Sequence, residues 1–472
     1  MSPRGARWVA LTTTLVLALA LLFVLPRFAA DVVRSAIEAE SAADRAAFAA
    51  GESPWSWELR EPDDVVAGRT FGSGTLDAGK DGLVFTSTDD GSAMEIGLPL
   101  ARQADLVRLD TLRMRATASV DGAYGLLLRE TLDEPLRRAS LGKLASAELD
   151  RPIRLDTLSW LDAEGRPVRP PTRAAMLRIV ASLPAGATFT IDHASLDPAH
   201  GVVTPPIGAL PSRLSAEGLL AWRDSQRAAD PLVTFGTLPP ATAQPEWRAW
   251  ILPIGYLLVL ATAGLRLLSR ARQPSPADDL LNAVLALAGP LWFIAGMELS
   301  SRPAPPGVVM FAAGVVYALF LNGRRLLPAW NWLGAWRAAG WPLLAIPIAA
   351  GVVAFGGHAP VWPPLGRALI YVGWALFQQW LLLAVFGALL ARVMPRAAAV
   401  LLTALAFALL HTPNGLLMQL CFVAELGWAW WYVHRRALLP VAVAHAASAV
   451  LLQAGLAGGL LRSLEVSARF LN

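Results

Sequence analysis

The sequence predicts a polytopic α-helical membrane protein of about nine transmembrane helices, with an exported all-β domain inserted after the first helix. Of the 472 residues, 55% are hydrophobic and 16% are charged. The apolar residues are gathered in long blocks, as in proteins that span membranes. One long polar stretch, residues 31–248, interrupts these blocks, and its central part alternates apolar and polar residues at the spacing of β-strands.

Residues 1–30 are predicted to be an uncleaved transmembrane anchor. Basic residues precede an apolar run of roughly 18 residues, and no small-residue cleavage site follows it directly. Arg4 and Arg7 place the N-terminus in the cytoplasm, so residues 31–248 are expected on the other side of a bacterial-type inner membrane. Residues 31–54 are alanine-rich and amphipathic, which predicts a juxtamembrane helix.

Residues 55–200 are predicted to form a β-sandwich that resembles, weakly, the jelly-roll modules that bind carbohydrate. Six segments alternate apolar and polar residues: 83–88, 93–98, 112–119, 124–130, 176–183 and 187–195. Trp55, Trp57 and Trp160 are the candidates for stacking on sugar rings, although a tryptophan in a sandwich more commonly belongs to the core. A sandwich that binds protein, or that serves as a spacer, is an equal alternative. The single cysteine, Cys421, lies in an apolar run and leaves this domain without a disulfide.

A proline-rich linker and a short helix are expected at 201–248, and the rest of the chain is predicted to lie in the membrane. Residues 249–365 are expected to form accessory helices, residues 366–461 a core, and residues 462–472 a tail. The apolar spans are 249–268, 279–298, 306–322, 341–356, 366–391, 397–412, 415–433 and 437–461. Arginine-rich connections alternate with connections of low charge, which predicts the arginines on the cytoplasmic side. The net charge of +4 therefore indicates membrane lipids as partners rather than nucleic acid.

Five polar residues lie inside the C-terminal spans, where an unpartnered polar side chain is costly: Gln378, Gln379, His411, Glu425 and His445. At about 1.5 Å per residue, Gln378 and His411 reach a similar depth, and helix tilt can bring His445 to the same level. The sequence therefore predicts a shared polar pocket. Each residue has an alternative role, because a glutamine can join two helices and His411 can lie at a helix end.

Residues 366–461 resemble the CPBP family of intramembrane proteases, also called the Abi family, which includes the type II CAAX prenyl proteases and bacteriocin-processing proteins. Phe407 to His411 reads F-A-L-L-H, like the family's F-x-x-x-H helix, and a short turn containing Asn414 follows. A later run ends at His445, like the family's last histidine helix. The family's E-E-x-x-x-R and final Asn or Asp are replaced here by Gln378, Gln379, Leu383 and Ala449.

The resemblance implies a helical bundle in which a glutamate and two histidines activate water to cleave a peptide bond of a transmembrane or membrane-proximal protein. It implies catalytic roles for His411, His445, Gln378 and Gln379, and binding roles for Phe407 and Asn414. An amide cannot accept a proton from water, so Glu425 is the candidate replacement base, or else a structural partner of Gln379. Two histidines and a carboxylate also suit zinc, but no H-E-x-x-H helix is present and no cofactor is predicted.

A different class of function fits the same residues. The glutamine pair suggests altered or lost catalysis, which leaves a non-catalytic membrane receptor or scaffold as the alternative. In that case the pocket that corresponds to the protease site of the family holds a transmembrane segment, and the β-sandwich binds an envelope glycan or protein.

Overall fold

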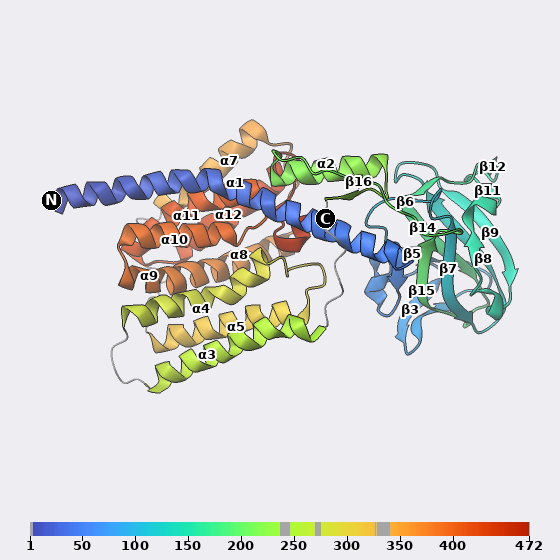
Figure 1. The fold of residues 1–472 in the computed structure, drawn as a ribbon, viewed down its shortest axis with the longest axis horizontal. Coiled ribbons are helices and arrows are strands. Elements are labelled where there is room, and N and C mark those ends of the chain that lie inside the picture. Colours follow the sequence, from blue (N-terminus) through green and yellow to red (C-terminus); the bar gives the residue numbers. More distant parts are fainter. Residues whose placement is uncertain (1–2, 237–245, 270–274, 326, 328–339, 472) are drawn as a thin grey trace. The chain divides into compact units, whose positions relative to one another are not determined.

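The computed structural model describes residues 3–236, 246–269, 275–325, 327 and 340–471 (Figure 1). The chain divides into two compact units. The membrane unit comprises Met1–Arg34, Ser212–Leu220 and Ala243–Asn472, and the β unit comprises Ser35–Pro211 and Ala221–Thr242.

The described residues contain seven helices that are long and apolar enough to cross a membrane. They are Thr12–Ala49, Trp247–Ser269, Pro276–Ala295, Pro305–Arg324, Leu365–Val393, Gly415–Arg435 and Leu439–Leu456. Two shorter apolar helical stretches, Gly340–Gly356 and Arg396–Leu409, overlap the predicted spans 341–356 and 397–412. The prediction of a multi-pass membrane protein is confirmed, and the count of nine spans stays a prediction.

The first helix, α1 (Pro3–Ala49), continues without a break through the predicted anchor and into the predicted juxtamembrane segment, where it ends at Ala49. Its 47 residues extend about 70 Å, roughly twice the thickness of a bilayer core. Pro26 lacks an N–H and leaves the carbonyl of Leu22 without its helical donor. The side chain of Gln419 donates to that carbonyl at 2.7 Å, so the proline creates the contact that joins α1 to a later helix of the same unit.

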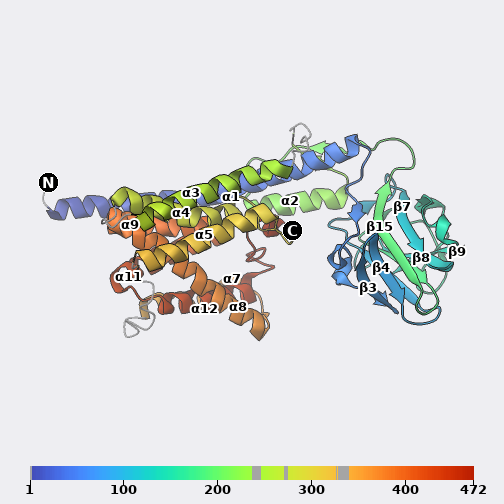
Figure 2. The ribbon, with the colours of Figure 1, turned by 90° about the horizontal axis from the view of Figure 1, so that it is seen from below.

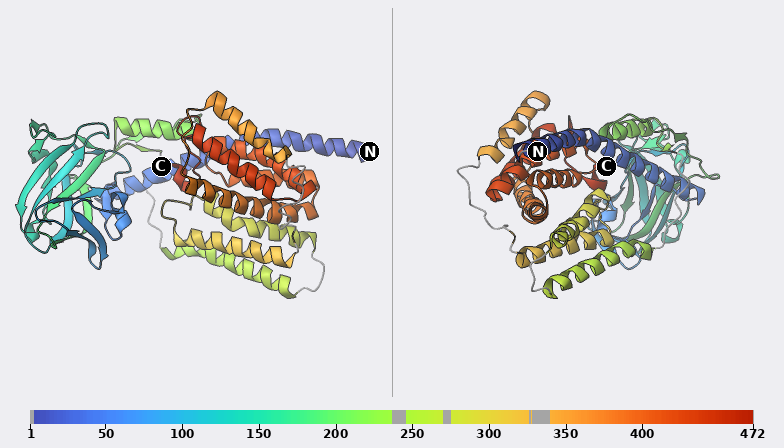
Figure 3. Two further views of the ribbon diagram at one scale, coloured as in Figure 1. Left: turned by 180° about the vertical axis from the view of Figure 1, so that it is seen from behind. Right: turned by 60° about the vertical axis from the view of Figure 1, so that its left-hand side comes forward.

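The remaining helices of the chain follow in order. They are α2 (Ala216–Ala229), α3 (Ile251–Ser269), α4 (Pro276–Ala295), α5 (Pro305–Arg324), α6 (Gly340–Leu343), α7 (Ala345–Gly356), α8 (Leu365–Gln379), α9 (Ala388–Val393), α10 (Arg396–Leu409), α11 (Gly415–Arg435) and α12 (Leu439–Leu456). A π-helix, Trp380–Gly387, joins α8 to α9. Figure 3 shows the C-terminal helices, orange to red, running alongside one another, with α10 against α11 and α12 against both α7 and α8.

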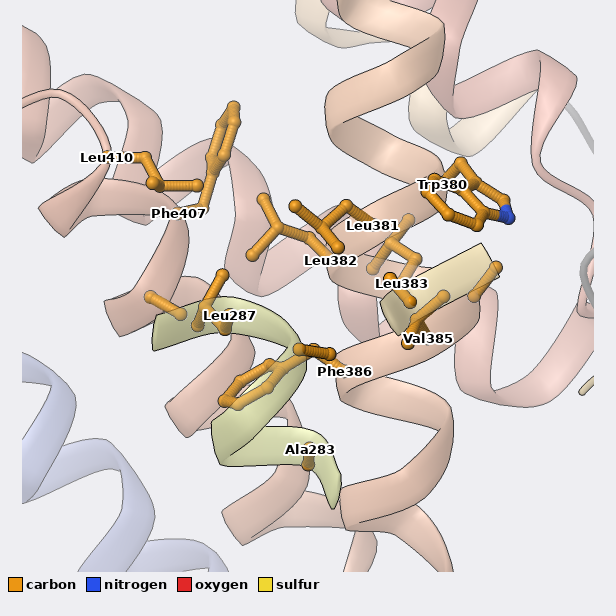
Figure 4. Close-up of a cluster of buried hydrophobic side chains, with 14 of the residues drawn as sticks. Ala283, Leu287, Trp380, Leu381, Leu382, Leu383, Val385, Phe386, Phe407 and Leu410 are labelled. Atoms are coloured by element: carbon orange, nitrogen blue, oxygen red, sulfur yellow. The ribbon is translucent and has the colours of Figure 1, made fainter. Parts of the chain in front are cut away.

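The π-helix forms the centre of the membrane unit. All eight of its residues are buried. Figure 4 shows Leu382 and Phe386 among side chains of α4 and α10, including Leu287 and Phe407. An uninterrupted run of apolar residues can be buried on every side, because none of its side chains needs a hydrogen-bond partner except the indole of Trp380.

Hydrogen-bonding side chains set several helix boundaries. Ser275 caps α4 and forms a capping box with Asp278. Asn414 caps α11 by accepting from the Leu417 amide at 3.2 Å. A buried ion pair between Asp279 and Arg325 connects the start of α4 to the end of α5.

The β unit contains two large sheets whose neighbouring strands are all antiparallel, which confirms the prediction of a separate region of antiparallel sheets. The first sheet has the order β10-β7-β15-β4-β3, with β1 also paired to β15. Its strands are β1 (Ser56–Glu58), β3 (Gly74–Gly79), β4 (Gly82–Ser87), β7 (Thr111–Ala118), β10 (Ile153–Arg154) and β15 (Thr188–Asp197). Figure 2 shows β3, β4, β15 and β7 in this sheet.

The second sheet has the order β12-β11-β9-β8-β14-β5-β2. Its strands are β2 (Phe71–Gly72), β5 (Ala93–Leu98), β8 (Gly122–Arg129), β9 (Arg137–Leu144), β11 (Trp160–Leu161), β12 (Pro167–Val168) and β14 (Met176–Ser182). Two short pairs complete the unit: β6 (Ala104–Asp105) with β13 (Arg173–Ala174), and the parallel pair β16 (Ile207–Gly208) with β17 (Thr234–Phe235). Side chains of both large sheets form one hydrophobic core.

The three tryptophans considered as sugar-stacking residues lie in this core. Trp55, Trp57 and Trp160 are only 3%, 9% and 1% exposed. Their indole N–H groups donate to the carbonyls of Arg102, Pro99 and Leu155. Their rings therefore offer no open face to a sugar, and the core alternative describes them correctly. A buried indole needs such a partner, but alternation alone did not indicate which face of each strand turns inward.

The loop between α7 and α8 is attached to the end of α12 through His358. Its Nδ1 and Nε2 each lie 2.9 Å from a carbonyl oxygen, those of Ala359 and Ala457. A carbonyl only accepts and a neutral imidazole has one N–H, so both bonds require the protonated ring. These two hydrogen bonds raise the pKa of His358 above its ordinary value.

We therefore predict that the contribution of His358 to stability depends on pH. Because its pKa is higher in the folded protein, the contribution is complete below the unfolded value of about 6.5 and is lost as pH rises through the raised value. The Tm difference between wild type and His358→Gln, measured in detergent, should be larger at about pH 5.5 than at about pH 8.5. An equal difference at both pH values would contradict this assignment.

Candidate functional site

A cavity of about 520 Å³ lies in the membrane unit among α8, α10, α11 and α12. Four of the predicted site residues line it: Gln378, Phe407, His411 and His445. Most of its other lining is apolar, including Trp374, Leu420 and Leu452. Three helices therefore bring two imidazoles and one amide into a shared pocket, as the membrane depths counted along the sequence predict.

His411 lies in the turn that ends α10, and its orientation is fixed by the preceding helix. Its Nδ1 lies 2.8 Å from the carbonyl oxygen of Phe407, the residue four positions earlier. Since that oxygen can only accept, Nδ1 carries the proton and Nε2 of the neutral ring keeps its lone pair. The Phe407 ring stands edge-on to this imidazole, with 4.7 Å between the centroids. His411 is therefore held as a proton acceptor at the cavity.

His445, on α12, has the opposite arrangement. Its Nδ1 lies 3.4 Å from Nε2 of Gln379, and the same amide nitrogen donates to Glu425 Oε2 at 3.1 Å. A primary amide has two N–H groups, so Gln379 can serve both acceptors. Nδ1 of His445 then accepts, and its proton lies on Nε2. The Phe407 ring also stands edge-on to His445, at 5.2 Å, so one phenylalanine separates and orients both imidazoles.

Glu425 and Gln379 lie behind the cavity rather than in it. Both side chains are completely buried, and neither lines the cavity. Gln378, the neighbour of Gln379, does line it. The two glutamines therefore have different roles: Gln378 faces the cavity, and Gln379 connects Glu425 to His445. This contact matches the structural-partner alternative for Glu425.

Asn414 also has a structural position. In addition to capping α11, its amide donates to the carbonyl of Ser463 at 2.7 Å. Asn414 is fully buried and does not line the cavity. It attaches the C-terminal segment to the helical core, which accounts for the polar residue that the sequence places after His411.

The C-terminal segment, expected to be a tail, forms part of the cavity wall. Leu464, Glu465, Val466 and Arg469 all line it. Ser467 holds the segment in place, with its amide on the carbonyl of Thr412 at 2.6 Å and its hydroxyl accepting from the Leu299 amide at 3.1 Å. Sequence reasoning missed these residues because the segment has no helical or strand period. The sequence signal for these residues was the presence of two charged residues, Glu465 and Arg469, in the short segment after the last histidine helix.

The described residues contain no group of three or more His, Cys, Asp or Glu side chains that could hold a metal ion. In the described part of the chain, His411 and His445 thus have no third ligand of these types. The zinc alternative raised by the sequence gains no support from the geometry.

The β unit has a polar groove of its own, on the outer face of the first sheet. The strand register sets two rows of side chains across β1, β15 and β7: Glu58, His193 and Arg115, then Ser56, Ser195 and Arg113. All six line the groove, together with acidic residues such as Asp150 and Asp197. Nδ1 of His193 lies 3.2 Å from Glu58, and Arg113 lies 3.5 Å from Asp197. This face offers hydrogen-bonding groups of both signs.

The region that contains the helical site is similar to one known family. Residues 329–451 match the family model described as type II CAAX prenyl endopeptidase Rce1-like. This match confirms the resemblance of the C-terminal region to the CPBP family. The match begins before residue 366, so α6 and α7, which the sequence assigned to the accessory helices, lie inside the matched region. The five polar residues of the site also lie inside it.

The other comparisons add little. No curated protein matches the sequence. Among solved structures, the salicylyl-acyltransferase SsfX3 from a tetracycline biosynthetic pathway is similar over 57% of this chain and 81% of its own, at 11% identity and a TM-score of 0.17. A likeness this weak carries no argument about fold or function.

The link between Gln379 and Glu425 can be tested by a double-mutant cycle. Gln379→Leu should lower the free energy of unfolding by about 2 kcal/mol, because it leaves a buried carboxylate without its hydrogen-bond donor. Gln379→Leu/Glu425→Leu should be less destabilised than Gln379→Leu alone, since removing both partners removes the unpaired group. The matched control is Gln378→Leu, which leaves the hydrogen bond to Glu425 in place and should destabilise the protein less than Gln379→Leu does. Thermal or detergent unfolding provides the measurement, and simple additivity of the two single changes would argue against the link.

Proposed function

We propose that this protein is an intramembrane endopeptidase homologue of the CPBP family, whose cavity holds a segment of a membrane-embedded or membrane-proximal protein. One observation carries the proposal. Two histidines line one cavity, and the hydrogen-bond partners of their Nδ1 atoms favour opposite tautomers. Nε2 carries a lone pair in His411 and a proton in His445. A base and a hydrogen-bond donor are the two groups that water attack on a peptide carbonyl requires.

The steps follow from those positions. His411 Nε2 accepts a proton from water as the water oxygen bonds to the peptide carbonyl carbon. His445 Nε2–H donates a hydrogen bond to the oxygen that becomes negative, and the Gln378 amide holds the substrate backbone. The imidazolium of His411 then gives its proton to the leaving nitrogen as the C–N bond breaks, which leaves a carboxylic acid and an amine.

Glu425 takes a positioning role in this scheme instead of the base role expected from the sequence. Its carboxylate does not line the cavity, and Gln379 stands between it and His445. By accepting one N–H of Gln379, Glu425 fixes the amide so that its other N–H faces His445 Nδ1.

The proposed topology follows the arginine distribution: nine spans, a cytoplasmic N-terminus and a β unit outside the cytoplasm, in a bacterial-type inner membrane. His411 lies at the end of α10 opposite to Arg396, whose connection is arginine-bearing. The site would then lie in the half of the membrane away from the cytoplasm. Membrane lipids and a membrane protein substrate are the partners that this placement supports.

The catalytic proposal is tested with the full-length protein in bilayers that contain a library of membrane-spanning peptides, with new N-termini counted by mass spectrometry. His411→Ala and His445→Ala should each lower the rate about 100-fold or more. Gln378→Glu should raise it roughly tenfold, because it adds a proton acceptor facing the cavity. Leu420→Ala, on the apolar wall, controls for altered cavity volume. Equal cleavage by the wild type and His411→Ala would overturn the proposal.

A non-catalytic receptor or scaffold is the second candidate, and two observations favour it. No carboxylate remains at the family's paired-glutamate positions, and the polar groove of the β unit provides a separate binding face. In this case the membrane cavity binds a transmembrane segment without cutting it, and the groove binds a polyhydroxylated ligand such as an envelope glycan, or a protein.

This alternative predicts that the full-length protein binds a class of saccharide on a glycan array. Arg113→Ser/Arg115→Ser should weaken that binding about tenfold or more, because both guanidinium groups line the groove. Arg138→Ser/Arg166→Ser, elsewhere on the same unit, is the charge-matched control and should bind as the wild type does. Absence of any saccharide signal, or equal binding by the groove variant, counts against a glycan at this face.

A further inference from the structure

A second, smaller cavity lies in the membrane unit where three helices end. It has a volume of about 150 Å³ and is bounded by the π-helix and α9, by α10 and by α11. Arg392 of α9, Arg396 of α10 and Arg436, which directly follows α11, line it. The family resemblance assigns no role to these arginines, and the proposed reaction does not use them.

The three arginines have no carboxylate partner in the part of the chain that the structure describes. Arg392 donates to a backbone carbonyl, that of Arg325, at 3.1 Å. No acidic residue lines the cavity. Three cations that converge without a counter-charge repel one another, and an anion held between them removes that repulsion. The planar guanidinium group forms paired hydrogen bonds with phosphate oxygens, which makes phosphate the matching anion.

Small and apolar residues line the cavity beside the arginines, including Gly387, Ala391 and Ala429. A Cβ on Gly387 would lie 2.9 Å from the Thr403 hydroxyl, so glycine allows these two lining residues to approach closely. The cavity therefore offers cationic groups and apolar surface next to each other. A lipid has the complementary arrangement, in which a phosphate is followed by apolar chains.

The position of the cavity fits the depth of lipid headgroups. The C-terminal end of α9, the N-terminal end of α10 and the C-terminal end of α11 meet at this cavity. Ends of membrane-spanning helices lie near the boundary between hydrocarbon and water, where the phosphates of a bilayer are found. Basic pockets between helices at this depth bind anionic headgroups.

We propose that this cavity is a binding site for the phosphate group of an anionic membrane lipid, held by Arg392, Arg396 and Arg436. The site is distinct from the histidine cavity. Arg396 and His411 lie at opposite ends of α10, about 22 Å apart at 1.5 Å per residue. The proposal does not depend on whether the histidine cavity is catalytic.

Thermal unfolding of the full-length protein in neutral detergent tests the site. Phosphatidylglycerol added to the micelles should raise the Tm of the wild type, whereas phosphatidylcholine should leave it nearly unchanged. Inorganic phosphate is the third arm, and a shift of equal size with phosphate alone would overturn the assignment to a lipid. Titration of the shift gives the apparent Kd for each ligand.

Arg392→Gln/Arg396→Gln/Arg436→Gln should weaken phosphatidylglycerol binding on the order of 100-fold, since each arginine near the surface contributes about a factor of five. The matched control is Arg266→Gln/Arg324→Gln/Arg435→Gln, which removes the same charge from helix ends outside the cavity and should retain the wild-type Kd. Gly387→Leu fills the cavity beside the arginines without changing charge and should weaken binding about tenfold. Equal weakening in both triple variants would show a general charge effect and would contradict the site.

Discussion

The hydrogen bond between Gln379 and Glu425 is the contact on which the membrane site depends. A carboxylate that is completely buried among apolar side chains is very costly without a donor. Gln379 supplies that donor at 3.1 Å and directs its second N–H at His445. The π-helix begins directly after Gln379, so the backbone that follows is fixed by apolar burial on every side. The amide that partners Oε2 of the buried Glu425 thereby also contacts a histidine at the cavity.

This arrangement accounts for three departures from the family pattern together. The family's paired glutamates and arginine occupy one helix, whereas here those positions hold Gln378, Gln379 and Leu383. The carboxylate lies on α11 instead, as Glu425, and an amide rather than an arginine partners it. An arginine at position 383 would have no carboxylate in its own motif, and Leu383 is buried in the core. The carboxyl group of Glu425 lies behind the cavity, so the two histidines and Gln378 are the polar groups of the proposed chemistry.

Much of the architecture follows from sequence patterns, because apolar length predicts membrane helices and alternation predicts antiparallel strands. Depth counting also brought Gln378, His411 and His445 to one cavity. Depth counting could not tell which of Gln378 and Gln379 faces the cavity. Neighbours on a helix point about 100° apart, and the rotation of the helix depends on its packing. The position of Glu465 at the cavity could not be predicted from the sequence. It depends on the hydrogen bonds that Ser467 and the side chain of Asn414 make to hold the C-terminal segment. The arginine cavity could not be predicted without knowing which helix ends meet.

The central claim is that His411 and His445 present opposite tautomers to one cavity. Nitrogen-15 NMR of the full-length protein with labelled histidine tests it most directly, because the two ring nitrogens of each tautomer have well-separated shifts. The chain has 6 histidines, so His411→Gln and His445→Gln spectra assign the two signals. The account predicts a proton on Nδ1 of His411 and on Nε2 of His445. The same tautomer in both rings, or the reverse pair, would contradict it.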